Sequence, residues 1–323
     1  MYDKILPNPI KTHVMEGATL AKEEKCDFII GLGGGSSIDA AKSIAIMVNN
    51  PGDYWDYIHG GSGKGKVVEQ KVLPIVAITT TAGTGTEADP WTVITHEGKN
   101  EKIGFGTDDT YPVLSIIDPE LMLSIPSDLT AYQGFDAFFH AVEGVIAKIA
   151  TPVSDAYALK SIELVYKYLP TAVKDGKNLE ARTYVALANT LSGLVESTSS
   201  CTSEHSMEHA MSAYYPELPH GAGLILLSNS YFSHFKNVCP DRLSLMASVM
   251  GENSSAEGFL VALEKLKKAC GVSDLKMSDY GIQFNELPKM AQNSHDTMAG
   301  LYEMDRKSLS MKESLDIMEK AYK

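Results

Sequence analysis

The pattern of hydrophobic and polar positions changes character near residue 125. Before that point, short apolar runs bounded by turn residues alternate with stretches of helical spacing. Such runs are typical of strands, and they predict strands at residues 27–32, 72–79, 91–95 and 113–117. Residues 38–47 follow the first run with the spacing of an amphipathic helix. The alternation predicts an α/β fold with a largely parallel sheet over residues 1–125.

The pattern of residues 126–323 predicts helices alone. Long periodicities close to 3.6 residues replace the strand signals and are separated by proline, glycine or asparagine. The expected helices lie at residues 128–149, 153–169, 179–198, 202–213, 221–235 and 256–269. Because no internal repeat is visible, we expect an all-α domain that packs as a compact bundle rather than as a solenoid.

Composition and charge exclude several classes of protein. Lysine and arginine number 28 against 41 aspartate and glutamate residues, so the net charge of −13 makes nucleic acid an unsuitable partner. No apolar run of about 18 residues and no signal-like start are visible, which predicts neither a membrane span nor secretion. The four scattered cysteines predict reduced, mostly packing thiols in a cytoplasmic protein, without a disulfide scaffold or a cysteine zinc site.

Two turns that follow predicted strands carry candidate binding chemistry. Residues 31–39 read GLGGGSSID, where successive glycines and the amides of a helix N-terminus can approach a pyrophosphate. This is neither GxGxxG nor a P-loop, and a plain turn is the alternative. Residues 79–87 read TTTAGTGTE, which suits a sugar, a nicotinamide amide or a phosphate, or else caps the next helix. Two such turns on one sheet favour a dinucleotide.

Histidine spacing in the helical half indicates a metal site. Asp136 and His140 lie four residues apart on one predicted helix, as do His205 and His209, and His220 follows eleven residues later. One carboxylate with several imidazoles suits Fe²⁺ or Zn²⁺ better than Mg²⁺. Any single histidine could instead be a hydrogen-bonded structural residue. That interpretation applies to the remaining five: His13, His59, His96, His234 and His295.

Aromatic residues near these positions have two interpretations. Phe135, Phe138 and Phe139 recur at helical spacing, and Tyr214 and Tyr215 end a predicted helix. They could line an apolar substrate pocket, but aromatic residues at such spacing more often pack in a core. We therefore expect core positions for most of them.

The motifs together resemble those of the iron-containing (group III) alcohol dehydrogenase family. GGGSSIDAAK, TTTAGTGTEA, IIDPEL, GFDAFFHAVEG and HSMEHAMSAYYPELPHG occur in the order and spacing of that family, over almost the whole chain. The resemblance implies a dehydroquinate synthase-like architecture, in which an α/β dinucleotide-binding domain precedes an all-α metal-binding domain. A cleft between them would hold NAD or NADP and a divalent metal, usually Fe²⁺, with Zn²⁺ as the other candidate.

The resemblance also implies roles for individual residues. The metal ligands would be Asp136, His140, His205 and His220. His209 matches a histidine beside the nicotinamide and the substrate, where it is a candidate to relay the hydroxyl proton. The cofactor contacts would come from Gly34, Gly35, Ser36, Asp39, Thr79, Thr80, Thr84 and Lys102.

The implied reaction is hydride transfer between NAD(P) and a small primary alcohol or diol, with the aldehyde as the other partner. A zinc enzyme of the same fold, such as a glycerol dehydrogenase or a dehydroquinate synthase, is one alternative. A catalytically silent metal-binding fragment is another. A homodimer is also an expectation of the resemblance.

The chain departs from the family pattern in two places. Residues 2–10 resemble the family's third strand, so the first βαβ unit is expected to be absent, together with the usual determinant of NAD against NADP. That loss would expose strand edges and weaken binding of the cofactor. The turn between His209 and His220 also has one residue more than in many members, which affects the expected geometry of the turn.

Overall fold

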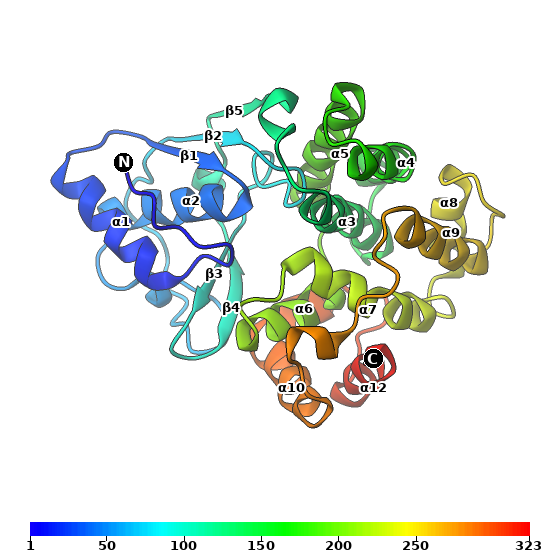
Figure 1. Ribbon diagram of the computed structural model, residues 1–323. Helices are drawn as coiled ribbons and strands as arrows, with labels where there is room; N and C mark the ends of the chain where they lie inside the picture. Colours follow the sequence, from blue (N-terminus) through cyan, green and yellow to red (C-terminus); the bar gives the residue numbers. More distant parts are fainter.

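The computed structural model describes residues 1–323 and shows an α/β region followed by a helical region (Figure 1). The α/β region contains α1 (Lys11–Glu23), β1 (Ile29–Gly33), α2 (Gly35–Asn49), β2 (Ile75–Thr79), β3 (Thr92–His96), β4 (Glu101–Phe105) and β5 (Leu114–Ile117). All four predicted strands and the predicted helix are present, and α1 and β4 are additions to the expected set.

A three-stranded parallel sheet in the order β1-β2-β5 forms the centre of this region. α2 packs on one face of the sheet and α1 packs on α2, so both helices lie on the same side (Figure 1). In the observed register, Ile30 pairs with Val76 and Val76 with Leu114, which places these side chains on the opposite face. That face leaves large apolar side chains exposed, namely Ile30, Leu32, Leu114 and Ile116.

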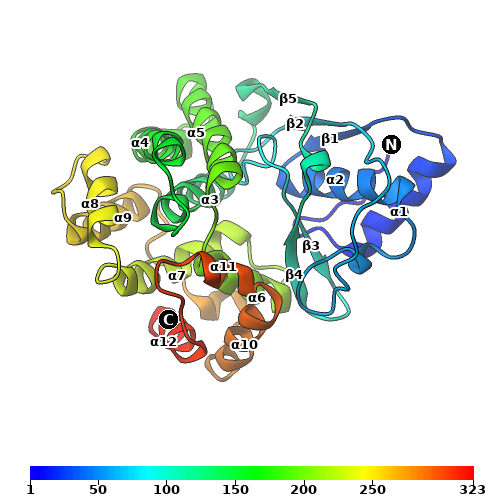
Figure 2. The ribbon, with the colours of Figure 1, turned by 180° about the vertical axis from the view of Figure 1, so that it is seen from behind.

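The strand predicted at residues 91–95 exists, but it lies outside the parallel sheet. β3 pairs with β4 in an antiparallel hairpin, and Asn100, next to the strand β4, adopts a positive φ of 51° that asparagine tolerates. The hairpin extends toward the helical region, where β4 contacts α6 and α10 (Figure 2). Residues 2–10 form no strand. Ile10 makes only one isolated bridge to Thr95, and Pro7 and Pro9 have no N–H to donate.

No strand follows Ile117, and the rest of the chain is helical. The helices are α3 (Ser127–Ile146), α4 (Pro152–Lys174), α5 (Leu179–Thr198), α6 (Ser203–Tyr214), α7 (His220–Phe235), α8 (Pro240–Val249), α9 (Ala256–Ala269), α10 (Leu287–Thr297), α11 (Ala299–Met304) and α12 (Met311–Ala321). α5 and α9 have the expected bounds, whereas α8, α10, α11 and α12 lay outside the expected set. Local signals for them exist in the chain, because Pro240 opens α8 and Ser310 forms a capping box with Glu313 at α12.

α3 runs through the centre of the helical core. Every residue from 134 to 146 is buried, and α4, α5 and α7 pack around this helix. Phe135, Phe138 and Phe139 are fully buried, and Phe138 and Phe139 stack on aromatic rings of α9 and α7. The expectation that these rings are core residues is confirmed. Such packing leaves α3 little freedom, so the polar side chains that it carries are held in place.

None of the helices combines the length and the apolar character that crossing a membrane requires.

Candidate metal centre and cofactor cleft

Three helices bring the predicted metal ligands together. Asp136 and His140 lie one turn apart on α3, His205 lies near the start of α6, and His220 is the first residue of α7. Asp136 Oδ1 is the common centre of this group. It lies 3.7 Å from His140 Nδ1, 3.7 Å from His205 Nε2 and 3.4 Å from His220 Nε2.

This group is buried and only partly satisfied by the protein itself. Asp136 and His205 are each 3% exposed, and neither Asp136 Oδ1 nor His205 Nε2 has a hydrogen-bond partner. Leaving a buried polar atom without a partner costs about 1–3 kcal/mol, and more for a charged group. A cation between a carboxylate oxygen and imidazole nitrogens removes this cost, so the donor set fits a divalent metal ion.

Protonation states at the centre also suit a metal ion. Burial raises the pKa of Asp136, but His140 and His220 outweigh it and hold the pKa well below its usual value. Burial lowers the pKa of His140 to about 4, so this imidazole is neutral near pH 7. Ionised carboxylate and neutral imidazole are the forms that bind metals. Asp136 and His140 are therefore poised for binding before any ion arrives.

Two glutamates orient the other two histidines. Glu143 on α3 accepts a hydrogen bond from His205 Nδ1, and Glu208 on α6 accepts one from His220 Nδ1. Each bond leaves the Nε2 atom of its histidine facing Asp136. Burial lowers the pKa of His220, but Glu208 outweighs that effect and raises the pKa overall. Metal binding requires a neutral ring, so acid will oppose binding of a metal ion by His220.

The sequence interpretation did not include these glutamates, although a local signal for them exists. Glu143 follows His140 by three residues and Glu208 follows His205 by three, so each lies on nearly the same helix face as a predicted ligand. Lys102 on β4 also contacts Glu208, with 3.3 Å between Nζ and Oε2, and its Nζ lies 2.8 Å from Ser212 Oγ. The lysine thus links the hairpin to the metal centre.

His209 lies beside the metal centre and makes no contact with Asp136 Oδ1. Its ring centroid is 5.4 Å from that of His220, and its Nδ1 is buried without a hydrogen-bond partner. Burial, together with the nearby charge of Lys102, holds its pKa well below 6.5. The ring is neutral and able to accept a proton.

A cleft of about 220 Å³ lies between the two regions and reaches these histidines. Four of the predicted cofactor residues border it, namely Ser36, Asp39, Thr84 and Lys102. Gly34, Gly35, Thr79 and Thr80 do not border it. Thr79 donates its hydroxyl to Thr81 O at 2.8 Å, and the Thr80 amide donates to Gly33 O at 2.8 Å. The Thr79 contact lies within the second turn, and the Thr80 contact joins the second turn to the first.

The glycines of the first turn permit this close packing. Gly33 has a φ of 146°, which favours glycine, and it pairs with Thr79 where β1 and β2 end side by side. A Cβ atom at Gly35 would lie 2.3 Å from Thr84 Cγ2. We expected the glycine to leave room for a phosphate, but the nearest atoms belong to the second turn. No side chain caps α2, and although the Ser37 amide donates to Gly34 O, the amides of Gly35 and Ser36 remain free to bind an anion.

The carboxylate of Asp39 accepts hydrogen bonds from groups of the protein itself. Its Oδ1 accepts a hydrogen bond from Thr86 Oγ1 at 2.7 Å, and its Oδ2 accepts one from the Val93 amide at 2.9 Å. These bonds tie α2 to the second turn and to β3. Asp39 is 7% exposed at the edge of the cleft, so its main observed role is to hold the wall of the cleft together.

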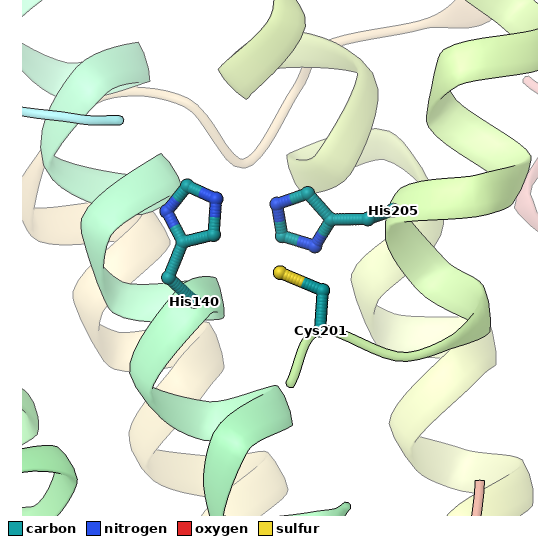
Figure 3. A group of neighbouring side chains, drawn as sticks. All are labelled: His140, Cys201 and His205. Atoms are coloured by element: carbon teal, nitrogen blue, oxygen red, sulfur yellow. The ribbon is translucent and has the colours of Figure 1, made fainter. Parts of the chain in front are cut away.

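Cys201 borders the cleft, although the sequence analysis did not include it among the site residues. The sequence predicted mostly packing cysteines, and Cys201 is an exception because it borders the cleft. The residue lies on the segment between α5 and α6, and Figure 3 shows its sulfur atom next to the ring of His205, on the side that faces His140. Glu196 at the end of α5 lies beside it and borders the same cleft. Only the folding of this segment against α3 brings the thiol to the histidines.

Comparisons with known proteins agree with this architecture. A family model described as iron-containing alcohol dehydrogenase matches residues 1–119, and one for the C-terminal part of the Fe-containing alcohol dehydrogenase family matches residues 130–322. The chain is 36% identical over 310 residues to the NAD-dependent methanol dehydrogenase of Bacillus methanolicus, covering 92% of this chain and 78% of that protein. It is 41% identical over 269 residues to alcohol dehydrogenase 4 of Schizosaccharomyces pombe, covering 82% and 62%, respectively.

The structure is also similar to solved structures of this kind. The archaeal halo-thermophilic Red Sea brine pool alcohol dehydrogenase, bound to NZQ, superposes with a TM-score of 0.95 at 33% identity. The alignment covers 99% of this chain and 83% of that one. On these matches, which extend over both regions, the chain belongs to the iron-containing alcohol dehydrogenase family.

Proposed function

We propose that the protein is an NAD(P)-dependent, metal-dependent alcohol dehydrogenase that interconverts small primary alcohols or diols and their aldehydes. The observation that carries the proposal is the convergence of one ionised carboxylate and three imidazoles beside a cleft, with the two polar turns of the sheet forming its other wall. The family membership and the NAD-dependent methanol dehydrogenase relative support the same reaction.

In this proposal Asp136, His140, His205 and His220 hold Fe²⁺, or Zn²⁺ in its place. The bound ion supplies Lewis acidity, which favours ionisation of the alcohol and polarises the aldehyde carbonyl. Glu143 and Glu208 keep the ring nitrogens of His205 and His220 directed toward Asp136. The helical region therefore provides a preorganised set of donors.

The other residues of the cleft bind and orient the reactants. The free amides at the start of α2, with Gly34, Gly35 and Ser36, bind the pyrophosphate. Thr84 and Lys102 border the cleft where the cofactor passes toward the histidines, and Asp39, Thr79 and Thr80 hold the turns in position. His209 is neutral with an unpaired Nδ1, so it accepts the hydroxyl proton in the oxidation direction and returns it in reduction.

Variants of the two histidines on α6 test the assigned roles. His205→Ala removes a ligand and should lose bound metal, as measured by elemental analysis after dialysis. His209→Ala should retain metal but lower turnover and change the pH–rate profile, because the proton acceptor is gone. His234→Ala is the control, since His234 lies outside the cleft, and it should retain both metal and activity. Loss of metal from His209→Ala with retention in His205→Ala would exchange the two roles.

A second test addresses the seat of the cofactor. Gly35→Val places a branched side chain against Thr84 and should lower the affinity for NADH or NADPH at least tenfold, as measured by fluorescence titration. Gly300→Ala is the matched control, because a Cβ atom there meets nothing within 4 Å. Metal content should be unchanged in both variants. Unchanged NAD(P)H affinity in a folded Gly35→Val variant contradicts the assignment of the first turn.

The expected cytoplasmic location and homodimer belong to this proposal. All four cysteines are free, which agrees with a reducing compartment. The exposed apolar face of the sheet, with Ile30, Leu32, Leu114 and Ile116, is the kind of surface that promotes association of chains. Light scattering of the purified protein distinguishes a dimer from a monomer.

A further inference from the structure

The thiol of Cys201 is part of a compact group of donor atoms next to the Asp136 centre. One ligand atom each from His140, Cys201 and His205 lies within 4.8 Å of the others. The two imidazole rings are stacked, with 4.5 Å between their centroids, and the sulfur atom points toward the space between them (Figure 3). These residues come from α3, from the segment before α6 and from α6 itself.

The surroundings of Cys201 differ from those of the other buried cysteines. Cys239 and Cys270 pack in the apolar core of the helical region. Cys201 instead borders the cleft, and its polar neighbours are the two histidines and Glu196, whose Oε2 lies 3.9 Å from the sulfur atom. Burial raises the pKa of Cys201, so the free group is a thiol rather than a thiolate. A polar environment of this kind is not needed for a packing cysteine.

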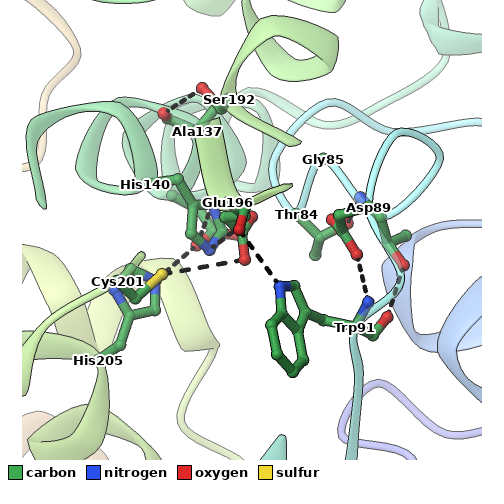
Figure 4. A network of polar contacts seen from close by, with 12 residues as sticks. Thr84, Gly85, Asp89, Trp91, Ala137, His140, Ser192, Glu196, Cys201 and His205 are labelled. Atoms are coloured by element: carbon green, nitrogen blue, oxygen red, sulfur yellow. Dashed lines mark hydrogen bonds and ion pairs between the residues drawn. The ribbon is translucent and has the colours of Figure 1, made fainter. Parts of the chain in front are cut away.

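Two further atoms near Cys201 also lack a partner. His205 is 3% exposed, and its Nε2 makes no hydrogen bond. Glu196 Oε1 is buried without a hydrogen-bond partner and lies 3.5 Å from His140 Nε2 (Figure 4). The ring of His205 and the carboxylate of Glu196, each with one unpaired atom, are therefore both neighbours of the sulfur atom. They indicate a ligand there that accepts electron pairs, which is the behaviour of a metal cation.

We propose that Cys201, His140 and His205, with Glu196 as the fourth donor, form a second metal-binding arrangement that overlaps the Asp136 centre and takes Zn²⁺. Nitrogen and thiolate ligands in a four-coordinate set favour Zn²⁺ over harder ions, whereas the carboxylate and imidazoles around Asp136 suit Fe²⁺. On binding, a metal–sulfur bond forms and the thiol proton passes to solvent. The inference rests on the proposed function because both arrangements share His140 and His205.

This overlap has a consequence for occupancy. Since the two arrangements share two histidines, the protein holds one ion at a time. The donor set of Cys201 includes neither His220 nor its neighbour His209. His220 Nε2 instead lies 3.4 Å from Asp136 Oδ1. Binding of Zn²⁺ through Cys201 would therefore compete with the Fe²⁺ form rather than add to it.

Cobalt is the probe for the sulfur ligand, because Co²⁺ replaces Zn²⁺ and its bond to a thiolate produces strong charge-transfer absorption in the near ultraviolet. The metal-stripped full chain is titrated with Co²⁺ as wild type, Cys201→Ser, Cys26→Ser and His220→Ala. Wild type, Cys26→Ser and His220→Ala should show the thiolate band, and Cys201→Ser should lose it. Cys26 is the matched control, since it is exposed and distant from the metal centre. Affinity for Zn²⁺ should fall at least tenfold in Cys201→Ser, with Fe²⁺ affinity little changed.

Three other results would overturn the proposal in distinguishable ways. Bound Co²⁺ without a thiolate band in wild type removes Cys201 as a ligand and leaves the proposed function intact. A band that is lost in His220→Ala and kept in Cys201→Ser points to another thiol. Failure of wild type to bind Co²⁺ at all contradicts both this inference and the proposed metal site.

Protection from alkylation provides a measurement that does not depend on the folding of Cys201→Ser. In a Cys26→Ser background, iodoacetamide labels the remaining thiols, and mass spectrometry reads each site. Saturating Zn²⁺ should slow labelling of Cys201 at least tenfold, while Cys239 and Cys270 stay at the low rate that burial imposes. Equal labelling of Cys201 with and without Zn²⁺ overturns the proposal.

Discussion

Two buried polar clusters face each other across the cleft, and they differ in how completely the protein satisfies them. In the α/β region, Lys42 is fully buried, and its ammonium group contacts Thr86 Oγ1, Asp89 O, Asp89 Oδ1 and Trp91 O. In the helical region, Asp136 Oδ1 and His205 Nε2 have no hydrogen-bond partner. The first cluster is a closed network, and the second is a set of donors that a ligand must complete.

This difference separates a structural role from a functional one. Lys42, Asp136 and His205 are each more than nine-tenths buried, so burial alone does not identify the site. A closed hydrogen-bond network holds its helices and turns together and gains no stability from a ligand. Unpaired buried donors destabilise the free protein, and a bound ligand that pairs with them removes this free-energy cost. The Lys42 network fixes α2 against the second turn and thereby shapes the wall of the cleft that we assign to the cofactor.

The largest expected effect comes from removing the centre of the open cluster. Asp136→Ala should lose bound metal and all measurable turnover, because three imidazoles lose the anion on which they converge. Wild type with metal at a hundred times its Kd should gain about 2.7 kcal/mol of stability, and the variant should gain none. Elemental analysis and thermal unfolding with and without metal check both statements. Full metal occupancy in Asp136→Ala would show that the Asp136 cluster does not need this carboxylate to bind metal, which contradicts its functional assignment.

Breaking the closed cluster should instead destabilise the fold and leave metal in place. Lys42→Met leaves Asp39 and Asp89 buried without their cation and should cost about 3–5 kcal/mol of unfolding free energy. Lys64→Met removes an exposed ammonium group from Asp56, which keeps its pair with Lys66, and should cost much less. Chemical denaturation measures both. An unfolding free energy for Lys42→Met equal to that of Lys64→Met would show that the network is not structural.

Asp305 is intermediate between the two clusters, because the protein satisfies only one of its two carboxylate oxygens. Its Oδ1 accepts hydrogen bonds from the Ser203 amide and Tyr231, its Oδ2 has no partner, and burial raises its pKa from 3.8 to about 7. Between these two pKa values the folded state binds more protons than the unfolded state, so stability should fall as pH rises from about 4 to about 7. The expected size is a few kcal/mol at most.

Replacement of that carboxyl group tests its pH effect. Asp305→Asn should flatten the dependence of unfolding free energy on pH within this window, as measured by denaturation at a series of pH values. The exposed Asp296→Asn variant should keep the slope of wild type. An identical slope in Asp305→Asn and wild type would assign the pH effect to other groups.

The smallest expected effect comes from the contact that joins the two regions. Glu208→Gln weakens the carboxylate that orients His220 and should lower metal affinity about 10–100-fold without abolishing binding. Lys102→Met removes the partner of Glu208 from the hairpin and should change metal affinity less than Glu208→Gln does. Competition with a metal chelator measures both affinities. A larger loss of metal affinity in Lys102→Met than in Glu208→Gln would show that a residue of the α/β region has the greater effect on metal binding.

Much of this organisation follows from local sequence patterns. A helix places residues four positions apart on one face, so the pairing of Asp136 with His140 and of His205 with His209 could be predicted without a structure. Strand and helix periods likewise predicted the α/β region and most helices, including the bounds of α5 and α9. The identity of the family followed from motifs that are continuous along the chain.

The tertiary structure decided which of these groups meet and which remain open. The approach of α3, α6 and α7 places His205 and His220 on Asp136 and brings Glu143, Glu208 and Cys201 to the same centre. The tertiary structure also decided that β3 pairs with β4 in a separate hairpin. It likewise decided that the Asp39 carboxylate accepts hydrogen bonds from Thr86 and Val93. Sequence patterns report contacts within a few residues of each other, because those depend on backbone geometry alone. Contacts between distant segments depend on how whole faces pack, and only that packing brought the thiol of Cys201, four residues before His205, beside His140 on α3 as well.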